Sequence, residues 1–220
     1  MKAAHVAAVL ALGAALAACD RSPAPPDDGR HTAVVGAGGS HVPDARGEPL
    51  PTLPLPANTQ AQVARTGSDS AVAVWVQDGH VFATAYAKGS GWGPSHPLET
   101  IYGQASEPQL AANGRGAALA VWRHTVGQIE SLRFSTFQAG RGWSAPDVVP
   151  GALPRSDGAE GAATLQLRMD DQGNAVAHWP SGFDANAMQV ARYVPGQGWS
   201  RAVDTPLPAR APASASSAAQ

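Results

Sequence analysis

The side chains best able to do chemistry are scattered along this 220-residue chain without a catalytic or metal-binding pattern. The four histidines of the central part, at positions 80, 96, 124 and 178, lack the close spacing of metal ligands. Serine, histidine and aspartate all occur, but the G-x-S-x-G sequence of a nucleophile elbow does not. The carboxylates form no pair at a recognisable spacing. The sequence therefore predicts no metal, no cofactor and no catalytic centre.

Cys19 is the only cysteine of the chain, and it stands at the end of an apolar N-terminal segment. Met1-Lys2 gives a short positive start, and an Ala- and Leu-rich run from Val6 to Ala18 follows. Because a membrane-spanning helix needs about 20 apolar residues, this run is too short to be one. Residues 1–18 are therefore predicted to be a secretory signal peptide.

The sequence Leu16-Ala17-Ala18-Cys19 resembles the lipobox of bacterial lipoproteins. The resemblance implies cleavage before Cys19, a diacylglycerol thioether on its sulfur and an acylated amino group, with chains such as palmitate. Two or three acyl chains would anchor the protein stably, because one chain alone binds membranes only marginally. The alternative is an ordinary signal peptide that ends in a cysteine by chance.

Residues 19–57 are predicted to be a Pro- and Gly-rich tether between this anchor and a folded domain. Within it, Thr32–Gly36 could form a strand. The resemblance places the domain in the bacterial cell envelope, in the periplasm or at the cell surface. Asp20 resembles an inner-membrane retention signal, which leaves both the inner and the outer membrane open. Residues 206–220 are Ala-, Ser- and Pro-rich and are predicted to be a disordered tail.

The rest of the chain carries a sequence pattern that occurs three times. Each copy has a glutamine (Gln62, Gln109, Gln166), then A-x-A-x-W beginning nine residues later, then [YF]-x-x-G-x-G-W. The copies recur about every 50 residues, a period typical of propeller blades and repeat arrays. The tryptophans that end the second block are Trp75, Trp122 and Trp179.

Each copy is expected to fold into a four-stranded antiparallel sheet, so the fold class is all-β with three tandem blade-like sheets. The copies comprise residues 58–105, 106–160 and 161–205. Gly, Asn and Asp clusters after the glutamine strand predict tight hairpins. In A-x-A-x-W the alternating positions are mostly apolar on both faces, which predicts strands covered on both sides by neighbouring sheets.

The two repeated blocks resemble those of bacterial proteins built from propeller-like blades, distantly related to the sialidase (Asp-box) propeller superfamily. The resemblance implies a partial or oligomer-completed β-propeller. The Asp-box sequence S-x-D-x-G-x-x-W is not present in full, since Gly-x-Gly-Trp matches only its end. A sialidase also needs a cluster of arginines, for which Arg123, Arg133, Arg168 and Arg192 qualify only by residue type.

Three blades are too few for a ring, because propellers close with roughly 4–8. The open ends would expose sheet faces and strand edges to other chains. One hypothesis is that a homodimer, or a partner, completes the ring. The alternative is an open stack of three sheets with the strand at Val34-Val35 covering one end.

Two sets of residues are candidate contacts. Gln62, Gln109 and Gln166 could line a central channel, or their amides could hydrogen-bond neighbouring blades to each other. The variable loops after A-x-A-x-W, at residues 77–80, 123–130 and 180–187, could bind a ligand or partner. Arg123, His124, Phe183 and Asp184 are the predicted contacts in these loops.

Three functions remain open. The first is a lipid-anchored envelope protein with a non-catalytic binding or scaffold domain for proteins or glycans. The second is a degenerate sialidase-like or lyase-like enzyme acting on a glycan, and the third is a shortened propeller relative without independent activity. A flat apolar face would favour the first, and converging carboxylates and arginines would favour the second. Removing the signal peptide with Lys2 changes the formal charge from −2 to about −3, so no nucleic-acid partner is expected.

Overall fold

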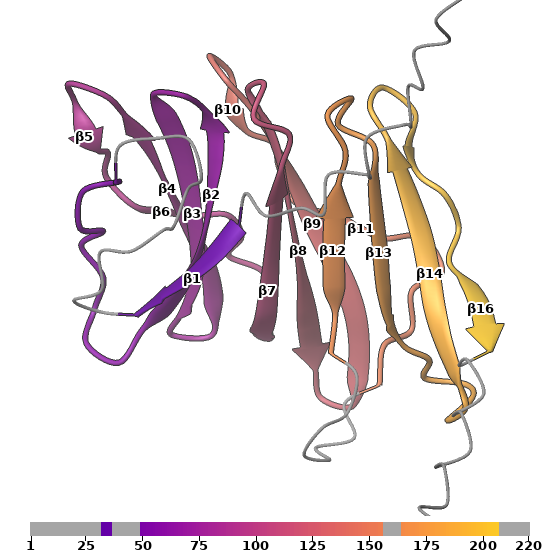
Figure 1. Cartoon of the computed structure of the whole chain (residues 1–220). Coiled ribbons are helices and arrows are strands. Elements are labelled where there is room, and N and C mark those ends of the chain that lie inside the picture. The colour runs from indigo at the N-terminus through magenta and orange to yellow at the C-terminus, as the bar shows by residue number, and fades with distance from the viewer. Residues whose placement is uncertain (1–31, 37–48, 156–163, 207–220) are drawn as a thin grey trace, which may run out of the picture.

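The structure, a computed structural model, describes residues 32–36, 49–155 and 164–206, the first of these by its backbone (Figure 1). Cys19, the signal peptide, most of the tether and the tail after Pro206 lie outside the described residues. The described chain is all β and contains no helix. The predicted fold class is therefore confirmed.

Three antiparallel sheets follow one another along the chain, and none is closed. Sheet 1 contains β1 (Thr32–Gly36), β2 (Gln60–Gly67), β3 (Ser70–Gln77), β4 (His80–Ala87), β5 (Gly91–Trp92) and β6 (His96–Pro97). Sheet 2 contains β7 (Gln104–Ala112), β8 (Ala117–Val126), β9 (Ile129–Gln138), β10 (Gly142–Trp143) and β11 (Asp147–Val148). Sheet 3 contains β12 (Gln166–Met169), β13 (Ala175–Pro180), β14 (Ala187–Val194), β15 (Gly198–Trp199) and β16 (Val203–Pro206).

The repeated blocks occupy equivalent places in the three sheets. A-x-A-x-W lies in the second strand of each repeat (β3, β8 and β13), between the glutamine strand and the strand that carries the aromatic residue near its end. The fourth strand is split. A Gly-Trp piece (β5, β10 or β15) and a later piece (β6, β11 or β16) both pair with the same neighbour.

Both glycines of G-x-G have positive φ in every copy, at 86° and 78°, 80° and 80°, and 78° and 84°. Residues with a Cβ rarely adopt this conformation, so glycine is needed to turn the chain into the Gly-Trp piece. The following Trp ring then packs against the aromatic ring that begins the block, as in Tyr86–Trp92, where the ring centroids are 5.5 Å apart.

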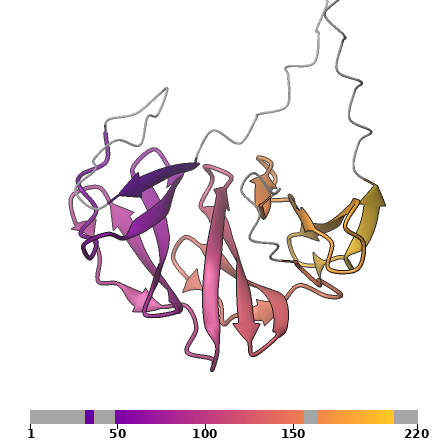
Figure 2. The same cartoon turned by 90° about the horizontal axis from the view of Figure 1, so that it is seen from below.

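The sheets stack face to face, and the two faces of A-x-A-x-W have different neighbours (Figure 2). The Ala and Trp face of sheet 2, with Trp122, packs on the valine face of sheet 1, with Val72 and Val74. The Ala and Trp face of sheet 3, with Trp179, packs on Leu119 and Val121 of sheet 2. Small alanines beside a large indole let the facing sheets interdigitate without voids.

The two ends of the stack are covered differently. The Ala and Trp face of sheet 1 is covered by the segment before β2, whose Leu50 and Leu53 are buried in a cluster with Trp75. The Trp92 indole nitrogen also donates a hydrogen bond of 2.9 Å to the Pro51 carbonyl. At the other end, Val176 on the outward face of sheet 3 is only half-buried.

In the alternative of an open stack, the strand at Val34-Val35 was expected to cover one end; the strand forms, as β1, but its place is different. β1 instead pairs with the edge of β2, with Val34 opposite Gln62 and Val35 opposite Ala61. An extended segment with unpaired backbone groups finds partners along a strand edge, not on a sheet face. Closing a ring head to tail with a second copy would require displacing Leu50 and Leu53 from the face of sheet 1.

Candidate binding site at the loop end

Exposed apolar side chains gather at the end of the stack that carries the turns after A-x-A-x-W, here named the loop end. The connections between sheets return to this end, as shown by hydrogen bonds from Leu98 N to Val81 O and from Ala105 N to Gly79 O, both 2.7 Å. Among the described residues, five of the seven exposed large hydrophobics belong to its turns and connections: Tyr102 (86% exposed), Val126 (38%), Ile129 (73%), Leu153 (39%) and Phe183 (72%). These five residues are the loop-end patch.

The members of the patch come from two sheets but are fixed relative to one another. The chain at Gly103, next to Tyr102, lies so close to β8 that an added Cβ would come within 2.6 Å of the Thr125 carbonyl. Ile129 and Leu153 line one hollow of about 450 Å³ together with Gly182, the neighbour of Phe183. A second hollow of about 420 Å³ lies between sheets 1 and 2. The loop end thus carries projecting apolar side chains beside two shallow hollows.

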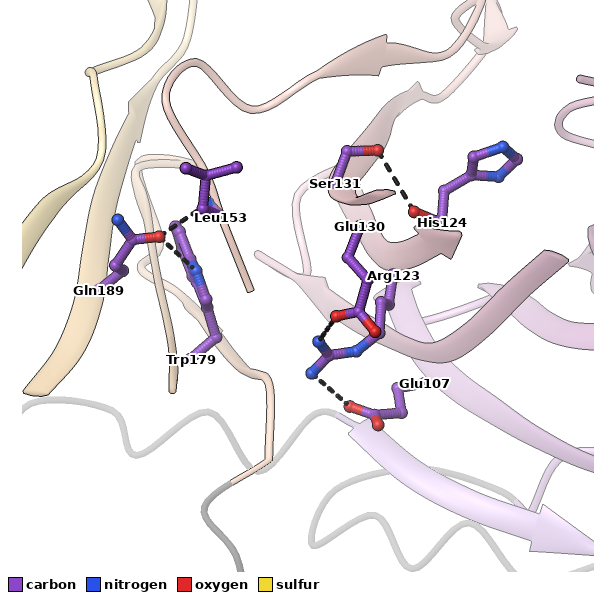
Figure 3. A network of polar contacts seen from close by, with 8 residues as sticks. All are labelled: Glu107, Arg123, His124, Glu130, Ser131, Leu153, Trp179 and Gln189. Atoms are coloured by element: carbon purple, nitrogen blue, oxygen red, sulfur yellow. Dashed lines mark hydrogen bonds and ion pairs between the residues drawn. The ribbon is translucent and has the colours of Figure 1, made fainter. Parts of the chain in front are cut away.

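Figure 3 shows an ion-pair cluster whose two glutamates line these hollows, Glu130 the first and Glu107 the second. The Arg123 guanidinium, 4% exposed, donates to Glu130 at 2.7 Å and to Glu107 at 3.4 Å. Glu107 has φ of 50° and belongs to a β-bulge between Ser106 and Gln109. The bulge turns its carboxylate toward Arg123, so both hydrogen bonds are made within sheet 2.

The prediction that Arg123 and His124 lie in a loop is wrong. β8 continues past Trp122 to Val126 and pairs with β9 along this whole length, so the extra residues of the second copy lengthen a hairpin. His124 is 1% exposed, and its Nε2 donates to the Tyr102 carbonyl over 3.1 Å. Its buried Nδ1 has no partner among the described residues. His124 therefore holds the backbone of Tyr102, and its contact with a ligand stays a prediction.

Phe183 and Asp184 do lie in an exposed loop, as predicted. The Ser181 hydroxyl accepts hydrogen bonds from the backbone nitrogens of both residues, at 3.2 and 3.3 Å. The Asp184 carboxylate accepts one from the backbone nitrogen of Asn186, at 2.8 Å. Gly182 N donates to Leu153 O at 2.8 Å and ties the loop to the connection from sheet 2. This loop presents the Phe183 ring from a well-bonded backbone.

The three glutamines occupy equivalent register positions, opposite Val74, Val121 and His178. Gln62 and Gln109 are half-buried, and no side-chain hydrogen bond is found for either within the described residues. Gln166 is exposed and accepts a hydrogen bond from His178 in its own sheet, at 3.0 Å. No hydrogen bond of these amides joins two sheets in the described part of the chain, and their channel role stays a prediction.

The four candidate arginines do not converge. Arg123 and Arg133 stand opposite Leu132 and Trp122 in the β8–β9 register, so they project from opposite faces of sheet 2. Arg168 and Arg192 flank Val176 on the outward face of sheet 3. Sheet 3 thus separates this second pair from sheet 2.

Tyr102, Ile129 and Leu153 were not among the contacts predicted from the sequence. The only sign of them there is a large apolar residue beside a turn or in a connection between sheets.

His178 should make the stability of the domain depend on pH. Burial and, second, the positive charge of Arg168 lower the pKa of His178 below its ordinary 6.5. Below that pH the unfolded chain binds more protons than the folded one, so the free energy of unfolding falls as the pH drops toward the folded-state pKa. Urea unfolding at about pH 7.5 and about pH 5 should show this loss, and His178→Gln should reduce it. An unchanged pH dependence in the variant would refute this role.

Comparisons of the chain with protein-family models, with curated proteins and with solved structures found no match. The structure itself defines the class of the protein as an all-β stack of three tandem sheets.

Among the described residues, no group of three His, Cys, Asp or Glu side chains could hold a metal ion. The same residues contain no helix that is long and apolar enough to span a bilayer.

Proposed function

We propose that this chain is a lipid-anchored cell-envelope protein whose three-sheet domain binds a partner protein through the loop-end patch and has no catalytic role. The observation that carries the proposal is the gathering of Tyr102, Ile129 and Phe183, each more than 70% exposed, at one end of the stack. Aromatic side chains are enriched at the centres of protein interfaces, and contiguous exposed apolar surface is typical of interaction sites. The sequence at Cys19 supports the anchor, and the Pro-rich tether supports a domain held away from the membrane.

The nature of the patch favours a protein over a glycan as partner. Two of its members are aromatic, but Val126, Ile129 and Leu153 are aliphatic and offer neither hydrogen bonds nor a flat ring to a sugar. Apolar projections beside hollows with both polar and apolar linings suit another protein surface, because protein interfaces combine both kinds of contact.

A glycan-acting enzyme is the weaker candidate. Among the candidate arginines, Arg123 is the one at the loop end, and it already pairs with the carboxylates of Glu107 and Glu130. A substrate carboxylate approaching it would meet two negative side chains. The remaining candidate arginines project from other faces, so no cluster comparable to that of sialidases supports catalysis at the loop end.

Crosslinking in intact cells tests the proposal. A photo-reactive amino acid at position 183 should yield a discrete, protease-sensitive adduct, and Ile129→Asp in the same chain should abolish it because a charge would enter the apolar contact. The matched control carries the photo-reactive residue at Val148, which is also exposed but lies on β11 at the outer edge of sheet 2. It should give no such adduct.

Two results would count against this proposal. Equal adducts from positions 183 and 148 would show that the loop end is not a specific surface. A protease-resistant, glycan-sized adduct would favour the glycan-binding alternative. The anchor is tested separately, since Cys19→Ala should release the domain from membranes and abolish labelling by a palmitate analogue.

A further inference from the structure

The segment that covers the Ala and Trp face of sheet 1, residues 50–56, has the sequence and the burial pattern of a polyproline II helix. In its sequence, Leu-Pro-Thr-Leu-Pro-Leu-Pro, a proline follows each leucine. Proline fixes its own φ near −65° and biases the residue before it to an extended conformation. Leu50 and Leu53 are 5% and 4% exposed, whereas the two residues between them are exposed. A polyproline II helix has three residues per turn, so the two leucines lie on one side of it.

The face of sheet 1 beneath this segment is a trough with aromatic sides. Trp75 and Phe82 are opposite each other in the β3–β4 register, with ring centroids 6.2 Å apart. Tyr86, four residues further along β4, forms the second ring pair with Trp92, at 5.5 Å. Ala73 lies between the two pairs on the same face, and its small side chain leaves room above the sheet. This surface, here named the aromatic trough, holds the leucines of the segment.

The contact between segment and trough has the features by which proteins bind proline-rich ligands. The Trp92 indole nitrogen donates a hydrogen bond of 2.9 Å to the Pro51 carbonyl. A polyproline II backbone makes no internal hydrogen bonds, so its carbonyls are free to accept them from a binding site. Tryptophan offers both an apolar ring and such a donor, and grooves lined by aromatic rings are the usual sites for proline-rich segments. Sheet 1 therefore has the chemistry of a peptide-binding site whose ligand is supplied by the same chain.

The segment covers the trough without pairing as a strand. In the described part of the chain, the bond from Trp92 to Pro51 is the only hydrogen bond between residues 50–56 and sheet 1. The equivalent faces of sheets 2 and 3 are covered by whole sheets of the stack. A cover held by leucine side chains and one hydrogen bond can leave without separating any of the three sheets.

We propose that the aromatic trough binds a proline-rich segment of a partner protein, of the form Leu-Pro-x-Leu-Pro, which exchanges for residues 50–54 of this chain. The chain's own segment defines the ligand, with two leucines three residues apart, prolines that hold the extended backbone, and a carbonyl for Trp92. Because the prolines restrict such a segment before it binds, little conformational freedom is lost on binding. The trough is separate from the loop-end patch, so this inference does not depend on the proposed function.

The probe is a fluorescent peptide, Gly-Glu-Leu-Pro-Thr-Leu-Pro-Leu-Pro, titrated with the full-length protein in detergent and followed by anisotropy, with detergent alone as the blank. Leu50→Ser/Leu53→Ser should free the trough and bind the peptide saturably. The unmodified protein should also bind it, but with an affinity at least about tenfold lower, because its own segment occupies the trough most of the time. Adding Trp92→Phe to the double variant keeps a ring but removes the donor, and should weaken binding about fivefold.

The matched control is Thr52→Ser/Ala57→Ser, which places two serines at exposed positions next to the leucines. It should bind the peptide as the unmodified protein does. Circular dichroism verifies that each variant is folded. If the double variant is not, the single variant Leu50→Ser decides, because a loosened cover should raise the affinity for the peptide above that of the unmodified protein.

Four outcomes would refute the proposal. A folded double variant that does not bind the peptide would show that the trough is no peptide site. Binding by the double variant but not by the unmodified protein would make residues 50–56 a permanent cover. Equal binding of a peptide with serine in place of its leucines would show unspecific adhesion. A dimer of the unmodified protein that the double variant does not form, measured by light scattering, would assign the trough to a second copy of the chain.

Discussion

Replacing Trp122 by alanine is expected to lower the free energy of unfolding by about 3–5 kcal/mol. The indole is fully buried and packs with Val72, Val74 and Val81 across the interface between sheets 1 and 2. Its nitrogen has no hydrogen-bond partner among the described residues, so the loss comes from packing and from the cavity left behind. Domains are typically stable by only about 5–15 kcal/mol, so this single change removes a large part of the total.

Urea unfolding followed by circular dichroism measures this effect. The matched control is Trp143→Ala, because Trp143 belongs to the same sheet but is only half-buried, and its loss should be clearly smaller. Equal losses for the two variants, or none for Trp122→Ala, would contradict the assignment of Trp122 to the interface between sheets.

Replacing Glu130 by alanine is expected to cost about 3 kcal/mol. The change leaves the Arg123 guanidinium, 4% exposed, with Glu107 at 3.4 Å as its remaining ion-pair partner in this cluster. Glu107 is 39% exposed, so it compensates the buried charge poorly. By contrast Asp69→Ala, which breaks the exposed pair of Asp69 with Lys88, should cost less than about 1 kcal/mol.

A second substitution separates the ion pair from other effects of Glu130→Ala. Adding Arg123→Met removes the uncompensated charge and keeps an apolar side chain in its place, so most of the lost stability should return. Urea unfolding of the single and double variants gives the comparison. If the double variant were no more stable than Glu130→Ala, the cost would have another origin than the buried charge.

Most of the architecture could be predicted from the repeat itself. A-x-A-x-W alternates small and large apolar residues on both faces, which identifies a strand between stacked sheets, and G-x-G identifies the turn that follows. The split of the fourth strand could not be predicted, because only its Gly-Trp piece belongs to the repeated block.

The candidate site was predicted less well. The repeat ends at Trp122, and the variable number of residues after it predicts a variable loop instead of a longer strand. Gly127-Gln128 flanked by Val126 and Ile129 is a short turn between apolar residues, which is the local signal of a longer hairpin. The burial of Arg123 could not be predicted either, because the sequence alone does not distinguish a buried arginine from an exposed one.

The packing of the segment at Leu50 and Leu53 on sheet 1 was not predicted, because its many prolines indicate an unpacked tether. The leucines between these prolines, Leu55 included, pack in the cluster that contains Trp75. The apolar face around Trp75 needs a cover, and a Pro-rich segment can provide it without forming a strand of its own.

The position of this segment also determines how the domain would respond to tension. If Cys19 is anchored in a bilayer and a partner is bound at the loop end, as we propose, a pull would reach β1 first and peel it from β2. It would next lift Leu50 and Leu53 from Trp75, and would reach the three stacked sheets last. The N-terminal segments would therefore detach first and lengthen the connection to the membrane, while the three sheets stay folded and the partner stays bound.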